Sequence, residues 1–158
     1  MESLEEYFIM ELERPLADIA ATREILDGQF PSTMEIVSIV LAAREKPTDL
    51  QAVYQVEVAS LPPGNHEQAL HRFLAARQWP VERLRKGKRK TIDIRPLVLS
   101  AVQKDDVIEF VLLHPHGRAG MGPYEVMEQL LALDREQARA ARITKIAMRP
   151  VPGQKPAG

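Results

Sequence analysis

The sequence contains no cysteine among its 158 residues, and this absence excludes several kinds of chemistry. A chain without thiols forms no disulfide and offers no thiolate nucleophile. It also supplies none of the thiolates that hold structural zinc or ligate iron–sulfur clusters. We therefore expect no cofactor in this chain, and no radical chemistry performed by the chain alone.

Long hydrophobic runs and aromatic side chains are scarce as well. Aromatic residues make up 5% of the chain, and no apolar run approaches the ~20 residues that a membrane-spanning helix needs. The N-terminus, MESLEEYF, is acidic and lacks the features of a signal peptide. Hydrophobic residues nevertheless reach 45% of the chain, as in globular proteins. The sequence predicts a cytoplasmic protein that contacts no membrane.

Positive charge is concentrated in one short segment, residues 81–96, which we call the basic arm. The chain has a formal net charge of −1, yet the arm holds seven of its 21 Lys and Arg residues and two of its 22 acidic residues. The rest of the chain therefore carries a net charge of −6. A charge distribution of this kind points to an anionic partner of the arm.

The order of predicted elements in residues 53–149 indicates an α+β fold. Alternation of apolar and polar residues predicts a strand around 54–58, and Asn65 followed by Gln68 predicts the start of a helix. Further strands are expected at 92–102, 107–113 and 142–148, with a helix starting near Pro123. The resulting β-α-β-β-α-β order is that of a ferredoxin-like unit.

The preceding residues predict half of a second unit of the same kind. Strands are expected at 6–12 and 34–41, with a helix between them that begins near Pro15 and ends at Gly28. The domain prediction is thus a half unit over residues 1–45, a complete ferredoxin-like unit over 46–149, and a disordered tail over 150–158. Because strand 6–12 is apolar on both faces, we expect the half unit to self-associate.

The basic arm has the pattern of a β-hairpin that turns at Lys86 and Gly87. A hairpin would place many cations on one ribbon, which suits the phosphate backbone of RNA. The candidate phosphate contacts in the arm are Arg83, Arg85, Lys86, Lys88, Arg89 and Lys90. No aromatic residue is interleaved, so base-specific readout through the arm is not expected. Two other interpretations remain open, an acidic partner protein and a solvated edge hairpin whose lysines oppose aggregation.

Three further residues are candidates for assisting the arm. Asp93 and Arg95 occupy alternate positions of a predicted strand, where Arg95 could contact a phosphate that Asp93 orients, or the two could form a structural ion pair. Arg118 lies in the glycine-containing segment HPHGRAGMG before a predicted helix. That spacing matches neither a P-loop nor a dinucleotide fingerprint, and a simple strand-to-helix loop explains it as well.

No motif in the sequence indicates catalysis or a metal site. The four histidines lack metal-ligand spacing, and no nucleotide-binding loop or paired-carboxylate motif is present. We therefore do not expect enzymatic activity from the chain by itself. The alternatives to an RNA-binding role are a protein-docking module and an enzyme with an unrecognised site near Asp93 and Arg95.

Two strings, "ESLEEYFIMELERPL" at residues 2–16 and "KGKRKTIDIRP" at 86–96, resemble one bacterial family. It is the radical-SAM-linked domain of unknown function, found alone or fused behind B12-binding radical-SAM proteins. The resemblance covers nearly all of residues 2–149, and it implies a radical-SAM partner and an RNA-related role. Family members begin with one more strand–helix–strand segment, and we expect this chain to be a fragment or a short form.

Overall fold

The computed structural model describes residues 1–6, 10, 12–41, 48–85 and 87–152. The chain separates into two compact units. The sheet unit comprises Met1–Tyr7 and Pro47–Gly158, and the N-terminal unit comprises Phe8–Lys46.

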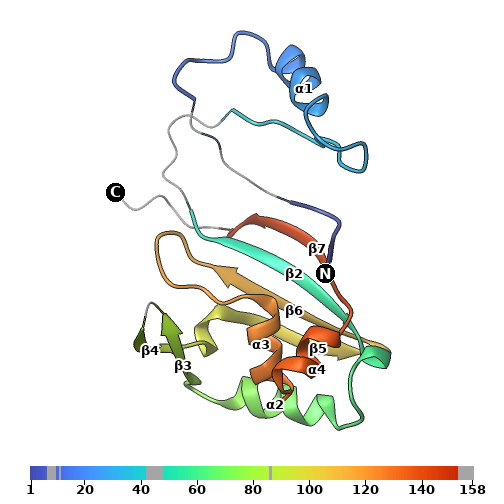
Figure 1. Cartoon of the computed structure of the whole chain (residues 1–158), viewed down its shortest axis with the longest axis vertical. Coiled ribbons are helices and arrows are strands. Elements are labelled where there is room, and N and C mark those ends of the chain that lie inside the picture. Colours follow the sequence, from blue (N-terminus) through green and yellow to red (C-terminus); the bar gives the residue numbers. More distant parts are fainter. Residues whose placement is uncertain (7–9, 11, 42–47, 86, 153–158) are drawn as a thin grey trace. The chain divides into compact units, whose positions relative to one another are not determined.

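A five-stranded mixed sheet forms the centre of the sheet unit (Figure 1). Its strands are antiparallel to their neighbours except at one edge, where β1 is parallel to β7. The spatial order is β1 (Glu2–Ser3), β7 (Ile143–Pro150), β2 (Leu50–Glu57), β6 (Val107–His114) and β5 (Val98–Lys104).

Helices cover one face of this sheet, and the core lies between the two layers (Figure 1). The helices are α2 (His66–Ala75), α3 (Pro123–Leu130) and α4 (Arg135–Ala140). Along β6, Ile108, Phe110 and Leu112 are buried, while the residues between them are only partly covered. This alternation arises because successive side chains of a strand point to opposite faces.

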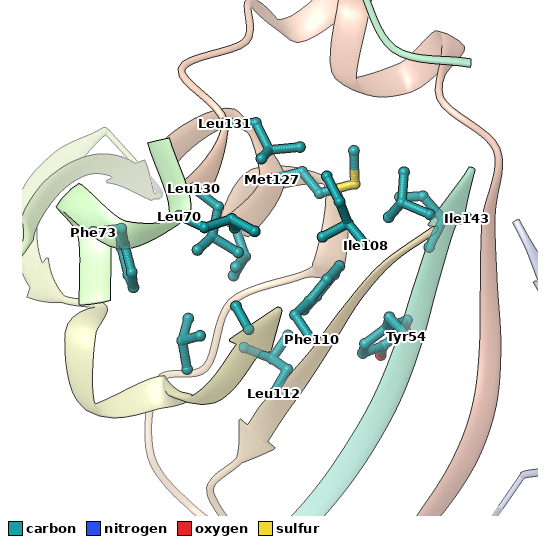
Figure 2. Packing of buried hydrophobic residues seen from close by; sticks show 14 of the residues in the cluster. Tyr54, Leu70, Phe73, Ile108, Phe110, Leu112, Met127, Leu130, Leu131 and Ile143 are labelled. Atoms are coloured by element: carbon teal, nitrogen blue, oxygen red, sulfur yellow. The ribbon is translucent and has the colours of Figure 1, made fainter. Parts of the chain in front are cut away.

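Figure 2 shows the packing that results from this alternation. Phe73 of α2 and Met127 and Leu130 of α3 lie over the sheet and belong to one cluster with Phe110. Phe110 also stacks on Tyr54 of β2, with ring centroids 5.2 Å apart. Large fully buried side chains of this kind each contribute roughly 1.5–3 kcal/mol through burial, so this single layer dominates the stability of the unit.

Local capping explains where the helices begin. The Asn65 side chain accepts a hydrogen bond from the Gln68 backbone N–H at 3.0 Å, which confirms the predicted start of α2. Pro123 occupies the first position of α3, also as predicted. The predicted core face of this helix is confirmed, because Met127, Leu130 and Leu131 are all buried.

The basic arm forms a separate two-stranded sheet, β3 (Pro80–Arg85) and β4 (Lys88–Asp93). Gly87 adopts φ 73° in the turn, a conformation that glycine reaches without strain. The hairpin prediction is therefore confirmed, although Lys86 lies outside the described residues. At its base, Val81 and Ile92 pack against the core cluster.

The structure differs from the sequence-based expectations for the sheet unit at three places. The strand expected over 92–102 is divided: β4 ends at Asp93, a short 3-10 turn covers Arg95–Leu97, and β5 begins at Val98. Helix α4 was not predicted, because six residues provide too little periodicity. Pro150, the first residue of the predicted tail, belongs to β7, and the Val151 N–H donates to the Asp49 carbonyl, while residues 153–158 lie outside the described residues.

The N-terminal unit contains α1 (Ile19–Asp27), which begins later than the Pro15 start that the sequence suggested. Asp18 is its N-cap and accepts hydrogen bonds from two backbone N–H groups, which fixes the first turn. The strand predicted over 34–41 is wrong, because these residues have no strand structure. An apolar run becomes a strand only when another strand pairs with it. Most of predicted strand 6–12 lies outside the described residues.

The fold class is therefore α+β, as predicted, with a five-stranded mixed sheet, a two-stranded sheet and four helices in the described residues. The prediction of ferredoxin-like repeats is not confirmed. The domain boundaries at 45/46 and 149/150 stay predictions. None of the helices that the structure describes has the length and hydrophobicity needed to cross a bilayer.

Self-association of the N-terminal unit remains a prediction, and exposed apolar side chains indicate where to test it. Val37 and Val40 are 77% and 82% exposed, and no residue of α1 is buried. We expect the chain to be larger than a monomer at about 100 μM, because exposed apolar patches associate. The double variant Val37→Glu/Val40→Glu should shift it toward the monomer in analytical ultracentrifugation. A wild-type monomer at that concentration would contradict this expectation.

Candidate nucleic-acid interface

The base of the hairpin is fixed to the core by a small set of backbone contacts. The Asp93 carboxylate accepts hydrogen bonds from the Trp79 N–H at 2.7 Å and the Arg95 N–H at 3.1 Å. The Ile94 N–H donates to the Trp79 carbonyl, and the Trp79 ring packs on Phe73 with centroids 4.9 Å apart. The two ends of the hairpin are therefore held together beneath the ribbon.

A second attachment holds the middle of the hairpin. The Arg83 Nη2 donates to both carboxylate oxygens of Glu125, at 2.9 and 2.8 Å, and Nη1 donates to the Gly120 carbonyl at 2.7 Å. Glu125 also accepts from the Gly122 N–H at the start of α3. Bidentate pairs of this kind fix orientation as well as distance. We call this arrangement the Arg83–Glu125 brace.

The outer half of the hairpin carries the cations that the brace leaves free. Lys88, Arg89 and Lys90 are all exposed. Within the described residues, Lys88 and Lys90 have no ion pair, and Arg89 lies 3.9 Å from the exposed carboxylate of Glu82. Arg85 is paired in register with Lys88, and its side chain lies outside the described residues. Such exposed, weakly paired cations can meet an external anion with little rearrangement.

Arg95 and Asp93 make contacts inside the fold, and the structural ion pair considered for them does not form. The Arg95 guanidinium donates to the Val98 and Leu74 carbonyls at 3.0 and 3.1 Å and lies over the Phe73 ring. Asp93 binds backbone N–H groups, so the two side chains form no ion pair. Because Arg95 sits in a 3-10 turn, the two residues do not share a strand face. The phosphate contact considered for Arg95 stays a prediction.

A groove of about 820 Å³ opens beside the hairpin. It is lined by β3, β4, the segment 118–120, α3 and α4, and it brings together Arg83, Lys90 and Arg118. Arg118 donates to the Asp49 carboxylate at 2.7 Å, yet its side chain is 68% exposed. The structure thus places Arg118 near the arm, although the two are far apart in the sequence.

Three residues that line this groove, Glu125, Glu128 and Arg135, were not among the candidates predicted from the sequence. Glu125 carried a detectable signal, because it stands three residues after Gly122 in the capping-box position of α3. Glu128 and Arg135 carried none, since a single charge on an exposed helix face is ordinary. Glu128 and Arg135 come together in one groove only because the hairpin packs beside α3 and α4.

A second group of ionisable residues lies on the sheet away from this groove. The Tyr54 hydroxyl and His114 Nε2 share a hydrogen bond of 3.2 Å, and the buried Lys145 pairs with Glu6. Burial, with a smaller effect of the Glu6 charge, raises the pKa of Tyr54 to about 12. Burial and then the Lys145 charge lower the pKa of His114. Both shifts favour the neutral side chains, and their hydrogen bond adds a side-chain link between β2 and β6.

Metal binding has no candidate in this part of the molecule. Among the residues that the structure describes, no group of three His, Asp or Glu side chains is placed to hold an ion.

The brace predicts a difference between two arginines of the same hairpin. Arg83→Ala should lower the free energy of unfolding by about 1 kcal/mol, because three hydrogen bonds to a partly buried guanidinium are lost. Arg89→Ala is the matched control and should change it by less than about 0.5 kcal/mol. Urea unfolding measures both values, and amide exchange should accelerate in β3 and β4 of Arg83→Ala only. Equal effects of the two substitutions would contradict the brace.

The pKa of His114 predicts a pH dependence of stability. Because folding lowers this pKa, the unfolded chain takes up the proton first as the pH falls below its ordinary value of ~6.5. Stability should therefore decrease between pH 7 and about 5.5. In His114→Gln, which does not titrate, this decrease should be smaller. Urea unfolding of the wild-type protein and of His114→Gln at the two pH values tests this. An equal decrease in the free energy of unfolding in both proteins would show that His114 does not contribute.

The comparison with protein families matches residues 1–123, a range that includes β1, the whole hairpin and most lining residues of the groove. The matching family is described as an uncharacterized protein conserved in bacteria (DUF2344). No curated protein and no solved structure matches the sequence. The match covers well over half of the chain, and the chain therefore belongs to this bacterial family.

Proposed function

We propose that this protein is a non-catalytic RNA-binding domain that contacts the phosphates of a structured RNA through the outer half of its basic hairpin. The observation that carries the proposal is the combination of a fixed base and free cations. The brace and the Asp93 contacts hold the ribbon, while Lys88, Arg89 and Lys90 remain exposed. Binding therefore costs little ordering of the backbone, and the cations release counterions from the RNA.

The RNA proposal includes two finer expectations from the sequence. The resemblance to radical-SAM-linked proteins supports a role beside a radical-SAM enzyme in the cytoplasm, with the present domain supplying RNA contacts. The neighbouring order β7-β2-β6-β5, connected through α2 and α3, supports one ferredoxin-like unit with the hairpin inserted after α2. In this proposal the sheet and its helices are the rigid platform, and the inserted hairpin is the part that binds.

One observation favours a second candidate, a docking module for an acidic protein. Leu84 is 74% exposed and stands opposite Arg89 in the hairpin register, so an apolar side chain shares one ribbon face with a cation. Protein interfaces commonly combine an apolar contact with surrounding charge. The enzyme alternative near Asp93 and Arg95 has less support, because both side chains are occupied by hydrogen bonds within the fold.

The RNA proposal predicts a steep dependence of affinity on salt. If four to six phosphates are neutralised, log K should fall against log salt with a slope of roughly −3 to −5. Fluorescence anisotropy of a labelled stem-loop RNA across a salt series measures this slope. An RNA affinity that does not change with salt concentration would contradict phosphate binding by the hairpin.

A double substitution assigns the contacts to the hairpin. Lys88→Ala/Arg89→Ala should weaken binding to all RNAs about equally and make the salt slope shallower by about 1–2, because two phosphate contacts are lost. Arg139→Ala/Arg142→Ala is the matched control, since it removes two exposed arginines that lie outside the hairpin and the groove. If the control loses as much affinity, net charge alone governs binding. Capture of a protein that survives nuclease treatment would instead favour the docking module.

A further inference from the structure

The groove beside the hairpin contains carboxylates, which a site for phosphates alone would not need. Its charged lining comprises Arg83, Lys90, Arg118 and Arg135, together with Glu82, Glu125 and Glu128. Like charges repel an approaching phosphate, so each carboxylate calls for a separate explanation. Two of the three are explained by contacts within the fold.

Glu125 is neutralised by the bidentate contact with Arg83. Glu82 lies 3.9 Å from Arg89, and both side chains are largely exposed. Glu128 is different, because it is partly buried, lines the groove and has no side-chain partner among the described residues. Since no described residue occupies this carboxylate, it is available to accept hydrogen bonds from a ligand.

The remaining lining suits a nucleotide rather than a bare phosphate. Carboxylates accept hydrogen bonds from base edges, and only guanine offers two adjacent donors, N1–H and N2–H₂, that match both oxygens. Lys90 and Arg135 line the same groove and can meet the phosphates on either side of the base. The volume of about 820 Å³ lies within the range of small-ligand sites, roughly 300–1,000 Å³.

The groove also provides surfaces against which a base can lie. Unstacked RNA bases are commonly received by aromatic rings or by the plane of an arginine guanidinium. The Arg83 guanidinium is held by three hydrogen bonds and its side chain is still 30% exposed. Leu84, Ile92 and Ala119 add apolar lining. A fixed plane costs little ordering when a base stacks on it.

We propose that this groove binds one unpaired guanine nucleotide of the RNA, with the Glu128 carboxylate accepting from the N1–H and N2–H₂ groups and Lys90 and Arg135 contacting the flanking phosphates. The inference rests on the proposed RNA-binding function and adds the source of its sequence preference. The hairpin provides affinity that is independent of sequence, and the groove selects the base.

The test compares two stem-loop RNAs of equal length whose loops are otherwise uridine and contain one guanine or one adenine. The wild-type protein should bind the guanine RNA roughly tenfold more tightly, as expected for a bidentate base contact. Glu128→Gln should reduce this ratio to within about twofold, because the amide keeps only one acceptor oxygen and turns an NH₂ donor toward the second donor of the guanine edge. Glu136→Gln is the matched control, an exposed glutamate of α4 outside the groove, and should keep the full preference.

Different outcomes separate the failure of this inference from that of the proposed function. Absence of salt-dependent RNA binding by the wild-type protein would overturn both. Salt-dependent binding with equal affinity for the two loops would overturn the guanine site alone. The guanine site would also be overturned if Glu128→Gln increased the affinity for both RNAs by the same factor. In that case the only effect of the carboxylate would be to repel the phosphates. Urea unfolding should show that Glu128→Gln remains folded, since glutamine has the same shape and the position is partly exposed.

Discussion

Burial of a single sheet face is the constraint on which the rest of the sheet unit depends. Phe110, Ile108 and Leu112 project from one side of β6, and only a layer of helices can remove them from water. The same layer also receives the base of the hairpin, because Val81 and Ile92 join the core cluster. The basic arm is therefore anchored by the hydrophobic core, even though its own outer half is entirely polar except for Leu84.

The Arg83–Glu125 brace turns this anchored ribbon into one wall of a groove. Glu125 caps α3 and binds Arg83 at once, so the helix start and the middle of β3 are fixed by one carboxylate. Arg83 is partly buried, and its charge is already used within the fold. The cations of the hairpin therefore have two different roles. The inner cation, Arg83, holds the ribbon against α3, and the outer cations are available for a partner.

Predictions from the sequence succeeded where local rules decide structure. Gly87 fixed the hairpin turn, Asn65 the start of α2 and Pro123 the start of α3, because each of these signals acts through the backbone of its own segment. Predictions from the sequence failed where the pairing of one strand with another decides whether a segment forms a strand. The run at 34–41 is apolar enough for a strand but forms none, and the apparent strand 92–102 is divided between two sheets at Asp93.

The sequence by itself determined the α+β class, the positions of most elements in the sheet unit and the concentration of positive charge in residues 81–96. It could not show that Arg83 and Arg95 are used inside the fold, because their hydrogen-bond partners, Glu125 and the Leu74 carbonyl, lie 42 and 21 residues away. Nor could it place Glu128 and Arg135 in one groove with Lys90. Only the tertiary structure decided which charges are used inside the fold and which remain free, because that depends on packing between segments distant in the chain.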